Sequence, residues 1–238
     1  MLITGAASGI GRATVLHAVA EGARVAAIDE EPDGLGATVE DARAAGGVVA
    51  SACVDVADTD ALAAAVSALV REVGTLDGVF ANAGILPPPT PLDALDATQW
   101  DRVLAVNLTG AVMTLVTSVP HLRDGAALLL NGSSLAIRPR EGRLAYVAAK
   151  AGVHAAGRAL ALELAPRRIR VNVIAPGLTD TPMVHAIPGH IETGLPGVPL
   201  GELVRPQEVA ALAVHLWSDD AAHLTGAVLS IDGGRTAG

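Results

Sequence analysis

The sequence predicts a doubly wound α/β fold, in which helices cover both faces of one parallel sheet. Short aliphatic runs alternate along the chain with longer alanine-rich segments of helical length. The aliphatic runs are continuously apolar and do not alternate with polar residues, which is typical of strands buried on both faces. No linker or internal repeat interrupts this order. We therefore expect one domain over residues 1–238, with a parallel sheet of about seven strands flanked by helices.

The expected elements follow from these runs and from the punctuation between them. The strand candidates are Leu2–Thr4, Ala23–Asp29, Val48–Asp55, Gly78–Asn82, Ala127–Asn131, Ile169–Ile174 and Val228–Asp232. The helix candidates are Gly11–Glu21, Asp33–Ala45, Asp60–Val73, Ala97–Leu122, Leu144–Leu164 and Pro206–Trp217. Glycines follow several of these helices, and Pro206 stands where the last one can begin. The Pro/Gly-rich stretch before Pro206 is expected to lie on the surface.

Composition excludes several classes of protein. Hydrophobic residues make up 51% of the 238 residues, so the chain can offset the entropy cost of ordering and is not disordered. The formal net charge is −9, and no basic block is present, which argues against nucleic-acid binding. The single cysteine, Cys53, cannot form an intrachain disulfide. No leader and no apolar run near the ~20 residues of a membrane span is visible, so a cytoplasmic protein without membrane contact is expected.

A glycine-rich loop follows the first strand. The segment Thr4–Gly11 reads TGAASGIG and leads directly into a helix. Glycines at such a turn let a pyrophosphate approach the free N–H groups of the helix N-terminus. The second strand ends at Asp29, where a carboxylate can accept hydrogen bonds from ribose hydroxyls and would repel a 2′-phosphate. A plain turn loop with a surface acid is the weaker alternative.

A tyrosine and a lysine are spaced to lie on one helix face. Tyr146 is the only tyrosine, and Lys150 follows it by one helical turn. A phenol is a poor base at neutral pH, but a nearby ammonium favours the phenolate. Taken alone, this pair is better explained as an exposed helix pair. Ser133 and Ser134 follow a strand end, where hydroxyls face the ligand crevice of an α/β sheet or simply turn the chain.

These motifs together resemble those of the short-chain dehydrogenase/reductase (SDR) family. The resemblance extends from Ile3 to Gly234 and implies a Rossmann-type domain that transfers a hydride between NAD(P) and an alcohol or ketone. The motifs occur in the family's order: Thr4-Gly-x-x-x-Gly-x-Gly11, Asn82-Ala83-Gly84, Asn107, Asn131-x-Ser-Ser134, Tyr146-x-x-x-Lys150, Pro176-Gly177 and Asp232-Gly233-Gly234.

The resemblance implies a role for each matching position. Tyr146 would be the catalytic acid/base, Lys150 would lower its pKa and bind the nicotinamide ribose, and Asn107 would fix a water. Ser134 would hold the substrate oxygen; the family's usual spacing selects Ser133, but the strand-end pattern favours Ser134. The cofactor-binding residues would be Gly5, Ser8, Gly9, Ile10, Gly11, Asp29, Asp55, Val56, Asn82, Ala83, Gly84, Tyr146, Lys150, Pro176, Gly177, Thr179 and Thr181.

The expected cofactor is NAD. Family members that bind the 2′-phosphate often carry a basic residue at the position of Ser8 or after the second strand. This chain has Asp29-Glu30-Glu31 there, so a phosphate would meet three carboxylates and no cation. A catalytically inactive NAD-binding scaffold, or a different user of the fold such as a methyltransferase or flavoprotein, remains the alternative.

The remaining candidates give weaker signals. No histidine pair has metal-ligand spacing, so no metal site is expected; His185 and His190 are interpreted as solvated loop residues. Arginines 138, 140 and 143 could attract an anionic substrate, but a solvated loop is favoured. Residues 183–205 resemble the family's substrate lid, and the substrate, a small alcohol or ketone, is not determined. Long helices that are apolar on more than one face predict a homo-oligomer, a tetramer or a dimer.

Overall fold

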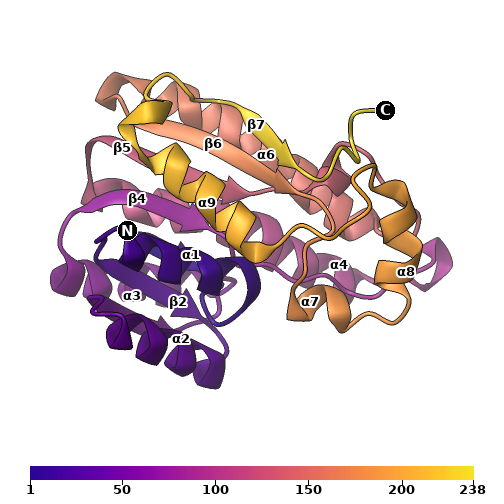
Figure 1. Ribbon diagram of the computed structural model, residues 1–238, viewed down its shortest axis with the longest axis horizontal. Helices are drawn as coiled ribbons and strands as arrows, with labels where there is room; N and C mark the ends of the chain where they lie inside the picture. Colours follow the sequence, from indigo (N-terminus) through magenta and orange to yellow (C-terminus); the bar gives the residue numbers. More distant parts are fainter.

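The computed structural model describes all 238 residues and contains one seven-stranded sheet. Its order is β3-β2-β1-β4-β5-β6-β7, and every neighbouring pair is parallel (Figure 1). This confirms the predicted α/β class. The strands are β1 (Leu2–Thr4), β2 (Val25–Asp29), β3 (Val49–Cys53), β4 (Leu76–Ala81), β5 (Leu122–Asn131), β6 (Arg170–Pro176) and β7 (Val228–Ile231).

Helices cover both faces of the sheet (Figure 1). One face packs against α1, α2 and α9 around Phe80, and the other packs against α3, α5 and α6 around Leu128. Both residues are fully buried. The helices are α1 (Gly9–Ala20), α2 (Pro32–Ala44), α3 (Thr59–Val73), α4 (Ala97–Leu104), α5 (Ala111–Ser118), α6 (Leu144–Leu164), α7 (Pro182–His185), α8 (His190–Gly194) and α9 (Pro206–Trp217).

Several element boundaries agree with the sequence. The bounds of β1, α6 and α9 are as predicted, and β1 has only three residues. Strand β5 is longer than expected, because pairing with β4 begins at Leu122 and crosses a register shift before Ala127. The predicted helix Ala97–Leu122 is interrupted by a π-helical turn at Ala105–Gly110, which separates α4 from α5. A π-turn adds a residue to the helical ring and redirects side chains, often at functional sites.

The helical stretch Ala97–His121 is long and apolar enough to span a membrane by length and hydropathy alone. In the fold it contacts α3 and α6, and Leu115 on it is fully buried in the core. Its apolar character is therefore that of a helix which packs inside a domain.

The topology places a crevice at the carboxyl ends of the strands. The chain order reverses between β1 and β4, because β1 leads through α1 to β2 on one side and β4 leads to β5 on the other. Ligands of open α/β sheets bind at such a reversal. The loops after β1, β4, β5 and β6 all open onto this edge, and α7 and α8 lie above it (Figure 1).

Candidate active site

The crevice brings most of the predicted site residues together. It extends from Asp29 at the end of β2 to Tyr146 on α6. Gly11, Asn107, Ser134 and Lys150 do not line it. The predicted residues that do line it are Gly5, Ser8, Gly9, Ile10, Asp29, Asp55, Val56, Asn82, Ala83, Gly84, Tyr146, Pro176, Gly177, Thr179 and Thr181.

The glycine loop needs glycine for two different reasons. Gly9 has φ +50°, and a Cβ there would lie 2.9 Å from Thr181 Cγ2 across the crevice. Gly11 faces inward, and a Cβ on it would lie 1.8 Å from the carbonyl oxygen of Gly5. Ser8 precedes α1 without a side-chain capping bond, so the first N–H groups of the helix stay open to an anion. The loop thus fits the pyrophosphate of a dinucleotide.

The three acids at the end of β2, residues 29–31, have different roles. Asp29 accepts the Ala7 N–H at 2.8 Å and the Glu31 N–H at 3.0 Å, which orients its carboxylate along the crevice. Glu30 also lines the crevice, but Glu31 accepts the Gly34 N–H and caps α2. Each Asp29 oxygen keeps a lone pair for a ribose hydroxyl.

The expectation that no cation lies here is wrong. Arg102 on α4 reaches the end of the crevice and bridges two carboxylates, Asp55 at 2.5 Å and Glu30 at 3.2 Å. The hydrogen bond to Asp55 and the charges of Asp55 and Glu30 raise the pKa of Arg102. Its charge is therefore already balanced by two acids, with Asp29 beside them.

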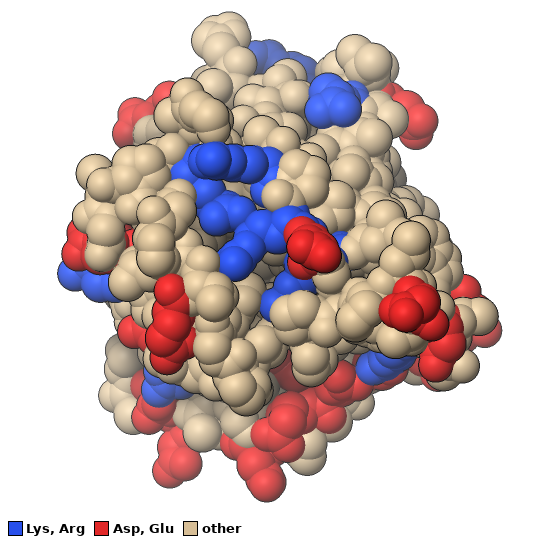
Figure 2. Space-filling view, turned by 90° about the vertical axis from the view of Figure 1, so that its right-hand side faces the viewer, with Lys and Arg blue, Asp and Glu red and all other residues tan.

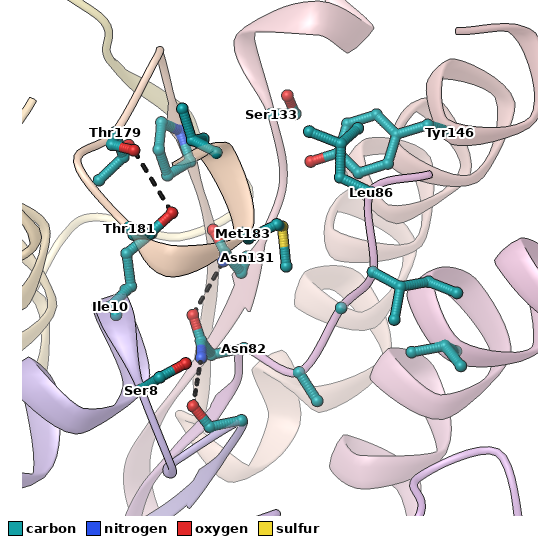
Figure 3. A pocket seen from close by; sticks show the side chains of 18 of the residues that line it. Ser8, Ile10, Asn82, Leu86, Asn131, Ser133, Tyr146, Thr179, Thr181 and Met183 are labelled. Atoms are coloured by element: carbon teal, nitrogen blue, oxygen red, sulfur yellow. Dashed lines mark hydrogen bonds between the residues drawn. The ribbon is translucent and has the colours of Figure 1, made fainter. Parts of the chain in front are cut away.

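Asn82 ties the strand ends under the loop. Its amide group donates to the Thr4 carbonyl at 3.0 Å. Its oxygen accepts from Asn131 at 2.9 Å (Figure 3). The backbone N–H groups of Asn82 and Ala83 donate to the Thr4 hydroxyl. These bonds fix the ends of β1, β4 and β5 relative to one another, so the floor of the crevice is rigid.

Ser133, not Ser134, faces the tyrosine. The Ser133 hydroxyl lies beside the Tyr146 phenol (Figure 3) and lines the crevice, whereas Ser134 is buried and begins a 3₁₀ turn that leads away. The prediction that Ser134 presents its hydroxyl to the crevice is therefore wrong. The reason is local: Ser133 is still extended, and its hydroxyl accepts the Leu135 N–H at 3.1 Å, which turns the chain immediately after it.

Burial dominates the pKa of the tyrosine. It raises the Tyr146 pKa above its usual value, while the Ser133 hydroxyl and the charge of Arg143 oppose that rise. Arg143 is the cation whose charge opposes the rise in the Tyr146 pKa, and the expected effect of Lys150 on the phenol stays a prediction. Burial thus favours the protonated form of Tyr146 at neutral pH.

Lys150 and Asn107 lie below the crevice floor. Burial lowers the pKa of Lys150 to about 8, and its Nζ donates to the Asn131 carbonyl at 2.7 Å and lies 5.8 Å from the Tyr146 ring centre. Asn107, on the π-turn, binds both backbone groups of Ile85, at 3.0 and 2.9 Å. A Cβ on Gly84 would collide with Asn107 and approach Lys150, so a glycine is needed between them.

Sequence reasoning did not identify three residues that shape this site. His154 accepts the Ser133 N–H at Nε2, 3.3 Å away, and burial together with Lys150 and Arg158 lowers its pKa to about 4. His154 follows Tyr146 by two helical turns on α6, and this spacing could have indicated that both residues face the site. Arg143 and His190 were interpreted as solvated loop residues but are buried, with the Arg143 guanidinium 3.1 Å from His190 Nδ1. No group of three potential metal ligands lies within reach of a single ion.

Comparison with known proteins agrees with this geometry. A family model described as "Enoyl-(Acyl carrier protein) reductase" matches residues 5–236. The chain is 38% identical over 239 residues to cis-4-hydroxycyclohexanecarboxylate dehydrogenase of Sinomonas cyclohexanicum, covering 99% of this chain and 96% of that protein. It is 40% identical over 238 residues to 3-oxoacyl-[acyl-carrier-protein] reductase of Thermotoga maritima, covering 98% and 96%.

The protein belongs to the short-chain dehydrogenase/reductase family. Two solved SDR structures carry a nicotinamide cofactor. The 3-ketoacyl-(acyl-carrier-protein) reductase of Brucella melitensis, complexed with NADH, superposes with a TM-score of 0.91 at 30% identity and covers 99% of this chain and 97% of its own. A short chain dehydrogenase of Burkholderia cenocepacia in complex with NADP gives 0.93 at 32%, covering 98% and 96%.

This SDR is therefore an oxidoreductase that acts on alcohol or ketone groups with a nicotinamide cofactor. The crevice fits that cofactor, because a side chain at Gly9 would narrow it toward Thr181 and a side chain at Gly11 would disrupt the glycine loop. Asp29 lines the crevice where a ribose would lie.

Proposed function

We propose that this SDR oxidises a secondary alcohol with NAD, or reduces the corresponding ketone with NADH. The observation that carries the proposal is the Ser133–Tyr146 pair at one end of a crevice whose other end holds Asp29. Bound NAD would supply the carbon that accepts the hydride. Tyr146 and Ser133 would manage the substrate oxygen, and the glycine loop, Asp29 and Asp55 would hold the cofactor.

The proton chemistry follows from the tyrosine's surroundings. During oxidation the alcohol O–H would give its proton to the Tyr146 phenolate oxygen, and the O–H electron pair would form the new C=O bond. The hydrogen on the alcohol carbon would leave with the C–H electron pair as hydride. Ser133 donates a hydrogen bond to the substrate oxygen, and His154 holds the Ser133 backbone in place. Lys150 would bind the nicotinamide ribose and add positive charge near the phenol. Asn107 would hold the backbone of Ile85, which lines the crevice.

NAD is proposed over NADP on the basis of charge. A 2′-phosphate would enter beside Asp29 and Glu30, and Arg102 at that end is already shared by two carboxylates. A phosphate without a cationic partner is repelled by a neighbouring carboxylate. NADP would therefore bind with a less favourable free energy than NAD, which has no 2′-phosphate. The neighbouring ribose hydroxyls of NAD would instead donate to Asp29.

The substrate is proposed to be a ring alcohol or ketone. The Sinomonas relative is named for the oxidation of a hydroxycyclohexanecarboxylate, and the cavity that holds Tyr146 is also lined by the apolar residues Leu86, Leu178, Met183 and Val184. We further propose that residues 183–205, which contain α8, form a lid over this substrate. Such a lid would exclude water from the hydride-transfer site.

Assembly into a homo-oligomer is proposed on the basis of exposed apolar side chains. Leu115 and Val153 are buried within the monomer, but Leu162 on α6 is 78% exposed and Val116 on α5 is 42% exposed. Apolar side chains on these two helices would be covered by a second copy. Sedimentation at micromolar concentration should give a dimer or tetramer; a monomer would contradict the proposal. A cytoplasmic location stays a prediction.

The function is tested by NADH formation. Purified protein is mixed with NAD and cis-4-hydroxycyclohexanecarboxylate or cyclohexanol, and absorbance at the NADH band is followed. A parallel reaction with NADH and a 3-oxoacyl thioester tests the activity named for the Thermotoga relative. The proposal expects NAD-linked oxidation of the ring alcohols; turnover of the thioester alone would contradict the ring substrate. Tight NADH binding without turnover of any alcohol or ketone would favour the inactive scaffold.

A further inference from the structure

Four arginines gather at the substrate end of the crevice. Three of them, Arg138, Arg140 and Arg143, lie on the loop between β5 and α6, and Arg235 follows β7. Figure 2 shows basic side chains around a hollow on the face where α7 and α8 lie. Arg140 and Arg235 line the same cavity as Tyr146. In a chain with a net charge of −9, this concentration of positive charge is local and specific.

None of these arginines has an acidic partner. The ion pairs of the protein all lie elsewhere. Arg138 donates to the Arg235 carbonyl at 2.8 Å and Arg140 to the Thr193 carbonyl at 3.1 Å, so both bind backbone oxygens. Arg143 donates to the Pro87 carbonyl and contacts His190. These contacts hold the loop and the lid but do not neutralise charge.

Arg235 has no side-chain partner at all. It is only 8% exposed, and its guanidinium makes no hydrogen bond or ion pair. Asp232, whose charge acts on Arg235, already accepts hydrogen bonds from the Gly234 and Thr236 N–H groups and from the Thr236 hydroxyl. The Arg235 side chain lines the cavity, and its nitrogens are not among the fully buried unpaired atoms. A largely desolvated charge without a counter-charge is costly, so an anion that entered the cavity would gain a partner there.

The electrostatics of the cluster point the same way. Burial lowers the pKa of Arg235, and the charges of Arg140 and Arg138 lower it further against the opposing pull of Asp232. His190, which also lines the cavity, has a pKa of about 4 because of burial and the charges of Arg143, Arg140 and Arg235. His190 is therefore neutral at pH 7. The arginines alone supply the positive charge, and a bound anion would offset both their burial and their mutual repulsion.

We propose that Arg140 and Arg235 bind a carboxylate of the substrate, so that this SDR acts on hydroxy- and oxo-carboxylates. The proposal rests on the alcohol/ketone function proposed above and names the substrate class of that same site. The alcohol carbon would lie at Ser133 and Tyr146, the apolar body against Leu178 and Met183, and the carboxylate at the arginines. A guanidinium fork matches a carboxylate in two parallel hydrogen bonds, which favours this anion.

The first test compares a charged with a neutral substrate. The rate constant kcat/KM is measured for cis-4-hydroxycyclohexanecarboxylate, for its carboxamide and for cyclohexanol, in wild type, R235Q and R140Q. Removing one partner of a buried charge pair weakens the complex strongly, so the ratio of carboxylate to carboxamide turnover should fall by at least ~30-fold in R235Q. R71Q makes the same change in net charge at an exposed, unpaired arginine on α3 and should leave the ratio unchanged.

The second test does not depend on turnover. With saturating NADH, cyclohexanecarboxylate should raise the melting temperature of the wild type more than cyclohexanecarboxamide does, and R235Q should lose that difference. Equal use of carboxylate and carboxamide, or a parallel loss of both in R235Q, would overturn the carboxylate site. If no alcohol is oxidised but cyclohexanecarboxylate still stabilises only the wild type, the proposed function fails and the anion site stands.

Discussion

The choice between two adjacent serines gives a sharp test of the site geometry. Ser133 faces Tyr146 in the crevice, and its hydroxyl also accepts the Leu135 N–H. Ser134 is buried, lies outside the crevice, and its hydroxyl makes no hydrogen bond within the protein. Replacing each serine by alanine removes one oxygen atom from almost the same place in the chain. Only one of the two substitutions should damage catalysis.

The expected magnitude comes from the contacts of Ser133. A donor lost from a developing oxyanion costs ~10²–10³-fold in kcat, so S133A should lose this much, while S134A should stay within about threefold of wild type. S133A also loses the bond to Leu135, which is worth about 1 kcal/mol of stability. For a domain of this size that corresponds to a fall in Tm of about 2–4 °C.

The pH profile separates a catalytic from a purely structural effect. Ser133 opposes the rise in the Tyr146 pKa that burial causes. Oxidation needs the phenolate, so S133A should shift the alkaline rise of the oxidation rate to higher pH. The assay is steady-state NADH formation across pH for wild type and both variants, with Tm measured in parallel. A severe loss in S134A with a mild loss in S133A would refute the assignment.

Three further outcomes are expected. D29A should lower kcat/KM for NAD by ~10²-fold, through two lost charge-assisted bonds, and change that for NADP far less; wild type using both cofactors equally would contradict this. The free energy of unfolding in urea should fall as the pH drops from about 6.5 to 4. His154 and His190 have pKa values of about 4 in the folded protein, so the unfolded chain takes up protons at these histidines first. Each histidine should lower the free energy of unfolding by up to about 3 kcal/mol, and a flat pH profile would rule this out. G9A should weaken NADH binding at least ~10-fold in a fluorescence titration, whereas G22A, with φ +81° but open space around it, should not; equal effects would point to backbone strain alone.

Much of this fold was predictable because the apolar patterning and the turn residues of the sequence indicate the same elements. Continuous apolar strands, glycine after helices and Pro206 at a helix start gave the bounds of β1, α6 and α9. The crevice residues followed from their positions at strand ends, since parallel strands bring their carboxyl ends to one edge. The bounds of α4 and α5 were not predictable. A π-turn at Asn107 leaves the apolar pattern almost unchanged and is decided by tertiary contacts with Ile85.

The positions of individual side chains in the site were harder to predict, because local geometry and long-range contacts determine them. Ser133 and Ser134 are identical in chemistry and differ only in whether the chain has already turned, which the Leu135 bond controls. Arg102 reaches Glu30 and Asp55 across a large sequence separation, so no local pattern reveals it. The burial of Arg143 depends on α8, which packs over it through His190. Long-range packing, not composition, determines these features.

The central claim is that Tyr146 exchanges the substrate proton, and one variant tests it most directly. Y146F keeps the buried ring and removes only the phenolic oxygen, so folding and NADH binding should survive. Single-turnover and steady-state oxidation of cis-4-hydroxycyclohexanecarboxylate with NAD should then fall by ~10²-fold or more relative to wild type. A Y146F protein that binds NADH as wild type does and retains near wild-type turnover would contradict the account.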